Sequence, residues 1–379
     1  MDKSTLAQYG WVVIVIIILV ILMSFATPFG QYFSDSTMAV VESFGEMSDV
    51  NKLLGNANAG GNAGAGGNEG SGGESDATEV ITNYTIEQIK ADTTMYAIGA
   101  SKEEYVVADF NDDFTEVIIT KNTENSDGAM MNFTDQNESC MTKHKDTLLR
   151  AYVKNGITNL GTRAFVSSHI ESISLPNTLT IIDNSALSFV DSLTTVNIPD
   201  SVTKINQYAF YRSSVVNVSM PTAPELVLGK DCFKESTSLK EIVFTNDSQK
   251  ITLEQGVFDG CTSIEKVTFM ENSLIEFKSG GRVFYNCTSL KECVLPKQMV
   301  NSTIYTSSFE KCSALSRITL PKPLNSDTLT LDALAFGYCT NLSEVYSYAA
   351  NVSIHGIHTG YYNSRSFLGC TSYSSITFI

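Results

Sequence analysis

The chain has 379 residues, of which 43% are hydrophobic and 17% are charged. This composition excludes a chain that is disordered throughout, and the length favours two or three structural units over a single core. The formal net charge of −16 argues against a nucleic-acid partner, because affinity for phosphate backbones depends on clustered Lys and Arg. Most of this charge, −14, lies in residues 1–150, so the larger part of the chain is close to neutral.

An apolar segment without charges follows the first residues. Residues 11–23 are continuously apolar, and residues 9–29 supply the ~20 residues that a helix needs to cross a membrane. Lys3 precedes this segment, and no Lys or Arg follows it until Lys52. The positive-inside rule therefore predicts a short cytoplasmic tail over residues 1–8, a single transmembrane helix over residues 9–29, and the bulk of the chain outside the cell.

A cleaved signal peptide is the alternative for the same segment. Ser24 and Ala26 are small residues where a peptidase would cleave, and cleavage near Ala26 would release the chain as a secreted protein.

Residues 30–54, which follow the apolar segment, are predicted to form a juxtamembrane segment. Residues 55–79 are rich in Gly, Asn and Ala and offer too little apolar surface to fold, so they are predicted to be a flexible linker.

One pattern recurs nine times from residue 157 onward. Each copy has an apolar landmark residue, often a Cys three positions later, then x-x-L-x-x-I-x-L and often Pro. The landmarks lie 22 to 31 residues apart and are Phe165, Leu187, Phe210, Phe233, Phe258, Phe284, Phe309, Phe336 and Phe367. A repeat of this length with this motif is typical of a leucine-rich repeat with one strand per coil.

The form of the repeat with Ala-Phe, Cys and Leu-Pro resembles the BspA-type leucine-rich repeat of bacterial, membrane-anchored surface proteins, over residues 151–379. This resemblance implies a β-rich α/β solenoid, a right-handed stack of about nine coils with a parallel sheet. The alternation of apolar residues within each copy supports the same fold independently of the resemblance. Two side chains of each segment, such as Ile242 and Phe244, share one face of a short strand, and neighbouring coils can cover that face. Only the eighth copy, with Val345 and Ser347, breaks the pattern.

Residues 80–150 do not follow the repeat and are predicted to form a small β cap at the N-terminal end of the solenoid. Within them, residues 103–120 alternate as a β-hairpin that turns at residues 111–113. The last strand pattern ends at Phe378 and Ile379, an apolar edge that could pair with another chain.

The cysteines mostly share one repeat position, occupied by Cys261, Cys287, Cys312, Cys339 and Cys370. In an exported protein they could form disulfides or hold a metal. We favour a structural row of small buried thiols, because parallel Cβ vectors suit the disulfide dihedral poorly.

Two repeat positions near the start of each strand carry charges that alternate in sign from coil to coil. In successive coils the first position holds Lys240, Glu265 and Lys291, and the second holds Glu241, Lys266, Glu292, Arg317 and Glu344. Neighbouring coils lie roughly 4.8 Å apart, so these charges should pair with each other rather than form a charged ligand groove.

The remaining residues point to binding rather than catalysis. The sequence contains no nucleophile elbow, phosphate-binding loop or zinc-protease motif, so we predict no catalytic residue, metal site or cofactor. Tyrosines that suit recognition are concentrated in the last two coils, and the candidate ligand contacts are Tyr346, Tyr348, Tyr361, Tyr362 and Tyr373. The family resemblance implies adhesion to a protein of a host or neighbouring cell. The alternative is a structural envelope protein that associates with itself through the C-terminal strand.

Overall fold

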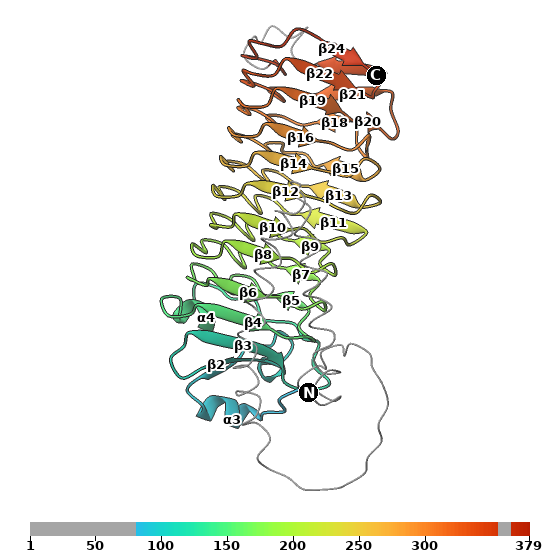
Figure 1. Ribbon diagram of the computed structural model, residues 1–379. Helices are drawn as coiled ribbons and strands as arrows, with labels where there is room; N and C mark the ends of the chain where they lie inside the picture. Colours follow the sequence, from blue (N-terminus) through green and yellow to red (C-terminus); the bar gives the residue numbers. More distant parts are fainter. Residues whose placement is uncertain (1–80, 355–364) are drawn as a thin grey trace, which may run out of the picture. The chain divides into compact units, whose positions relative to one another are not determined.

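The computed structural model describes residues 81–354 and 365–379, which belong to one compact unit, Ser75–Ile379. They form a parallel β-solenoid of about nine coils with very little helix (Figure 1). The predicted transmembrane helix over residues 9–29, the juxtamembrane segment and the linker lie outside the described residues. Within the described part of the chain, no helix is both long enough and apolar enough to span a membrane.

Eight of the nine predicted strands form a parallel sheet, here called the first sheet, whereas the strand of the first coil, β6 (Ser172–Ser174), belongs to the N-terminal sheet. The strands of the first sheet are β8 (Thr195–Asn197), β10 (Asn217–Ser219), β12 (Glu241–Val243), β14 (Lys266–Thr268), β16 (Glu292–Val294), β19 (Arg317–Leu320), β22 (Glu344–Ser347) and β24 (Ile376–Phe378). The alternation along each strand explains the sheet. Val196 and Val267 point inward and are buried, while their neighbours are more exposed.

A second parallel sheet shows that the prediction of one strand per coil was wrong. Its eight strands are β5 (Asn159–Leu160), β7 (Ile181–Ile182), β9 (Lys204–Ile205), β11 (Glu225–Leu228), β13 (Lys250–Leu253), β15 (Leu274–Phe277), β17 (Gln298–Met299) and β20 (Lys322–Pro323). A three-stranded sheet, β18 (Thr303–Ile304), β21 (Thr328–Leu331) and β23 (Asn351–Ile354), joins the late coils. These strands are two to four residues long, so the chain carries little alternation from which to predict them.

The landmark residues form the centre of the core. Phe210, Phe233 and Phe258 are fully buried, and their rings stack face to face with centroids 4.9 and 5.6 Å apart. The stack continues through Phe284, Phe309, Phe336 and Phe367 at 5.0 to 5.3 Å. Each coil therefore buries its landmark only against its two neighbours, which is the basis of solenoid stability.

The eighth coil accommodates its exceptional serine. Ser347 is fully buried, and its hydroxyl donates to the carbonyl oxygen of Ala349 at 3.2 Å. The amide of Ala349 in turn donates to the Ser347 hydroxyl at 3.1 Å. The polar side chain is thus satisfied where the other coils place an apolar one.

The turn at each landmark repeats the same backbone. The residues two before and two after the landmark have positive φ angles in the first eight coils: Arg163 and Ser167, Ser185 and Phe189, Tyr208 and Arg212, Asp231 and Glu235, Gly256 and Gly260, Arg282 and Asn286, Ser307 and Lys311, Leu334 and Tyr338. We call the line of these turns the turn ridge. The second of each pair donates its amide to the next coil, as Phe189 does to the carbonyl of Tyr211 at 2.8 Å.

The N-terminal part contains the predicted hairpin. β2 (Val106–Phe110) and β3 (Glu116–Lys121) pair antiparallel, which confirms it. β1 (Met95–Ala97) pairs with β2, and β3 pairs in parallel with β4 (Arg150–Val153), which pairs with β6 (Ser172–Ser174). The helices α3 (Ile86–Ala91), α4 (Cys140–Lys143) and the 3-10 turn Glu103–Tyr105 complete this part. Main-chain hydrogen bonds therefore join the hairpin to the first coils.

Candidate binding surface

The charged residues on the outer face of the first sheet pair as predicted. Glu241, Lys266, Glu292, Arg317 and Glu344 lie in register on successive strands. The Lys266 ammonium is 3.5 Å from the Glu292 carboxylate, and the Arg317 guanidinium is 3.7 Å from that of Glu344. These exposed ion pairs are individually weak, but they leave the sheet face without a block of like charge.

The adjoining column behaves in the same way. The Lys291 ammonium donates to the Glu265 carboxylate at 2.7 Å, and this hydrogen bond lowers the pKa of Glu265. Cations and anions of this face are thus engaged with one another. A partner of this surface would be selected by shape and apolar contact more than by net charge.

A groove of about 590 Å³ opens between β16 and β19. These strands share one register pair, Glu292 with Arg317, whereas β14 and β16 share three. Val294, Leu295 and Thr319 line the groove, and Val294 is 39% exposed despite being apolar. This feature is called the β16–β19 groove.

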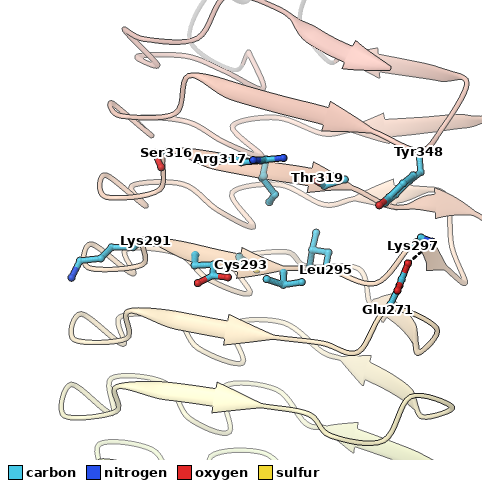
Figure 2. A pocket seen from close by; sticks show the side chains of 12 residues that line it. Glu271, Lys291, Cys293, Leu295, Lys297, Ser316, Arg317, Thr319 and Tyr348 are labelled. Carbon is cyan, nitrogen blue, oxygen red and sulfur yellow. Dashed lines mark ion pairs between the residues drawn. The ribbon is translucent and has the colours of Figure 1, made fainter. Parts of the chain in front are cut away.

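One end of the groove combines an aromatic ring with an ion pair. Figure 2 shows Tyr348 at this end, across from Lys297, which pairs with Glu271. Lys291 lies at the opposite end. The groove therefore has an apolar middle and polar ends, the arrangement that orients a ligand segment along it.

The structure brings two of the five candidate tyrosines to this surface. Tyr348 lines the groove, and Tyr346 lies on β22 in register with Thr319. The Tyr346 hydroxyl donates to Glu344 at 3.3 Å, and the Arg317 guanidinium sits 4.7 Å from the ring centroid. These neighbours hold the Tyr346 ring in place, which reduces the conformational entropy that it would lose on binding a partner.

The other three tyrosines are not brought to the groove by the described structure. Tyr373 stacks on Phe367, with centroids 4.0 Å apart, at the end of the core stack. Burial raises the pKa of its hydroxyl. Tyr361 and Tyr362 lie outside the described residues.

The five repeat cysteines share one role. Each thiol donates to the carbonyl oxygen of the landmark one coil earlier, at 2.8 to 3.1 Å, in the order Cys261, Cys287, Cys312, Cys339 and Cys370. All cysteines described are unbridged, and Cys370 is the least buried. Burial raises the pKa of Cys261 and Cys287. The residues described hold no group of three or more His, Cys, Asp or Glu side chains that could bind a metal.

Sequence reasoning missed two features of the repeat. Ser236 occupies the cysteine position in an earlier coil and donates to the Phe210 carbonyl at 2.7 Å, so the hydrogen-bonded row begins with serine. A cluster of Phe189, Tyr208 and Tyr211 forms on the turn ridge. The signal for this cluster was the aromatic residue two positions after Leu187, where the other coils carry polar residues or glycine, apart from Tyr338 in the eighth.

Comparison with known proteins places the repeats in a family. The model of the BspA type leucine-rich repeat region matches residues 158–277, 226–356 and 278–379. A leucine-rich cell surface protein from Faecalibacterium prausnitzii is similar at 16% identity, over 76% of this chain and 96% of that one, with a TM-score of 0.31.

Two further solved structures are similar in the same way. The T. pallidum leucine-rich repeat protein shows 18% identity over 57% of this chain and 90% of its own, with a TM-score of 0.34. A Bacteroides ovatus leucine-rich repeat protein shows 14% identity, 75% and 98% coverage, and a TM-score of 0.27. Curated proteins give no significant match. Because the family model matches more than half of the sequence, the chain belongs to the BspA-type leucine-rich repeat family.

Proposed function

We propose that this protein is a cell-surface binding protein that presents its solenoid for protein–protein recognition and catalyses no reaction. Its family and the Faecalibacterium prausnitzii cell surface protein support a surface location. The apolar residues 9–29 support anchoring to a membrane, and the Gly-rich residues 55–79 support a linker between anchor and solenoid. The partner would be a protein of a host or neighbouring cell.

The observation that carries the proposal is the β16–β19 groove. It offers exposed apolar surface at Val294 with Tyr348 at one end, and Tyr346 lies on the neighbouring strand β22. On the same face Lys266 pairs with Glu292 and Arg317 with Glu344. An apolar middle with a tyrosine and charged residues at the ends resembles protein interfaces, which are enriched in aromatic residues and have a polar rim. An extended segment of a partner protein would lie along the groove.

The test is adhesion by cells that display the full chain. Replacing both tyrosines, Tyr346→Ala with Tyr348→Ala, should reduce attachment to extracellular-matrix and host-cell proteins by about tenfold or more, because tyrosine is enriched among the interface residues whose truncation costs more than 1 kcal/mol. Surface display is measured in parallel with an antibody.

Tyr152→Ala is the matched control. Tyr152 lies on β4, on the outward-facing side of the N-terminal sheet, and is also partly exposed. Its replacement should leave attachment unchanged. Full attachment by the double variant at normal display would refute the groove as the contact surface.

Self-association through β24 is a second candidate. Phe378 and Ile379 are 54% and 62% exposed, which is high for large apolar residues. Light scattering by the purified full chain tests it. A mass larger than the monomer supports self-association, and a monomer excludes it.

A further inference from the structure

Three aromatic rings from two successive coils surround a hollow on the turn ridge. The centroid of Phe189 lies 5.1 Å from that of Tyr211, with the ring planes at 81°, and Tyr208 lies 5.3 Å from Tyr211. The hollow has a volume of about 270 Å³, and Ser185 and Lys234 contribute polar groups to it. We call it the aromatic hollow.

Burial does not account for the ring of Phe189, which packs edge-on against Tyr211 and lies 5.9 Å from the Arg212 guanidinium. This residue has a φ of 57°, which is unfavourable for a bulky side chain, and it is 42% exposed, so burial does not compensate. The same turn position carries Ser167, Arg212, Glu235 and Gly260 in neighbouring coils. The eighth coil carries Tyr338 at this position, but Phe189 belongs to a cluster of three rings, and this strained, exposed and clustered aromatic residue indicates a role in binding.

The charges around the hollow are already matched. The Arg212 guanidinium pairs with Glu235 at 2.6 Å and lies 5.2 Å from the Tyr211 ring centroid. The Lys234 ammonium lies 3.7 Å from Asp231 and 3.5 Å from Asp259. No surplus positive charge is therefore available for a phosphate or carboxylate, while the cations still carry N–H groups that can donate hydrogen bonds.

We propose that the aromatic hollow binds an uncharged pyranose ring, the terminal sugar of a glycan on another surface. One face of such a ring exposes C–H groups, which pack on the electron-rich face of an aromatic ring. Its hydroxyls can both donate and accept, so they match Lys234, Ser185 and the tyrosine hydroxyls. The hollow has the size of one such ring, and it lies on other coils than the β16–β19 groove, so it does not depend on the groove.

The experiment measures binding of methyl pyranosides of glucose, galactose, mannose and N-acetylglucosamine to the full chain, in a detergent without a sugar headgroup. Saturation-transfer NMR identifies the sugar, and tyrosine fluorescence gives the affinity. We expect at least one neutral pyranoside to bind, with little dependence on salt. Phe189→Asn should weaken it by about tenfold or more, since the stacking ring is removed.

Asparagine is chosen because it tolerates a positive φ, and Asn286 already holds this turn position in another coil. The matched control is Tyr338→Asn, at the same position of the eighth coil, with a φ of 59° and 44% exposure. Both variants should keep the unfolding temperature, and only Phe189→Asn should lose sugar binding.

Three results would overturn the proposal. The first is that none of the four pyranosides binds. The second is that Phe189→Asn binds as tightly as the unchanged chain. The third is that sodium N-acetylneuraminate or a tri-leucine peptide binds at a lower concentration than any of the four pyranosides. That result would assign the hollow to an anion or to an apolar protein segment.

Discussion

The repeat cysteines connect neighbouring coils through a hydrogen bond. Cys287 is fully buried, and its thiol donates to the carbonyl oxygen of Phe258 at 3.1 Å. Ser236 makes the equivalent bond with a hydroxyl. The position therefore favours a small side chain with a donor, which gives the Phe258 carbonyl a second hydrogen bond beside the one from the Cys261 amide at 3.1 Å.

We predict that Cys287→Ser and Cys287→Ala differ in stability. Serine keeps the donor, so the free energy of unfolding should fall by less than about 1 kcal/mol. Alanine removes the donor and leaves a small void, so it should fall by about 1–3 kcal/mol. Urea unfolding followed by circular dichroism measures both variants.

The thiol chemistry supplies the control for this prediction. Burial raises the pKa of Cys287 well above its ordinary value, so alkylating reagents at neutral pH should label it only after unfolding. Equal destabilisation by serine and alanine would contradict the hydrogen-bond role. A bridged Cys287 in non-reducing mass spectrometry would contradict the free thiol.

At the scale of elements, the hairpin β2–β3 is closed by an aromatic cluster. The ring of His144, just after α4, stacks on Phe114 with centroids 4.1 Å apart. Its Nε2 atom lies 2.9 Å from the Tyr96 hydroxyl, and Phe110 packs at 5.0 Å. Burial, with a smaller effect of Lys143, lowers the pKa of His144.

This cluster predicts a loss of stability in mild acid. The unfolded chain carries His144 with an ordinary pKa of about 6.5, above the folded value, so it binds more protons below that pH. The contribution of His144 to stability is therefore complete above about pH 6.5 and falls as the pH drops toward the folded pKa. Urea midpoints across this range measure the slope.

His144→Phe should flatten that slope, since phenylalanine can stack on Phe114 and carries no proton. His169 is the control, because it lies on the turn side of the first coil, 3.3 Å from Asp191, and outside the cluster. Its replacement by Asn should leave the His144 slope in place. An unchanged slope in His144→Phe would show that other groups cause it.

The two sheets show what could be predicted from sequence at this scale. The first sheet was predictable because inner residues such as Val267 alternate with polar ones, here Lys266 and Thr268. β7 and β9 have two residues each, and the hydrogen bonds between coils, rather than local alternation, determine them. The hairpin was predictable because both of its strands are longer and its turn is polar.

At the scale of the whole solenoid, the phenylalanine stack carries the cohesion. We predict that Phe258→Ala reduces the free energy of unfolding by about 3–5 kcal/mol, because it leaves a cavity between two stacked rings. Hydrogen exchange should show the greatest loss of protection in the coils of Phe233 and Phe284. If protection were lost equally in all coils and in β2 and β3, the result would contradict a model in which each coil is stabilised mainly by its nearest neighbours.

The architecture and one part of the candidate surface followed from the sequence, but the binding features did not. The repeat predicted the coils and the pairing of Lys266 with Glu292, because equivalent residues must lie in register. The β16–β19 groove lies where two neighbouring strands share only one register pair, and no residue of the repeat motif predicts this weaker pairing. The aromatic hollow needed the exposure and φ of Phe189, which only the folded chain reveals.

The left-handed turn position has a consequence for how such a protein can diversify. Its side chain is anchored by the same main-chain hydrogen bond in each coil whether it is Phe189, Arg212 or Lys311. Single substitutions here change what the molecule displays while the hydrophobic interior and the coil geometry stay the same. New specificities could therefore arise one codon at a time, on a scaffold that need not be redesigned for each of them.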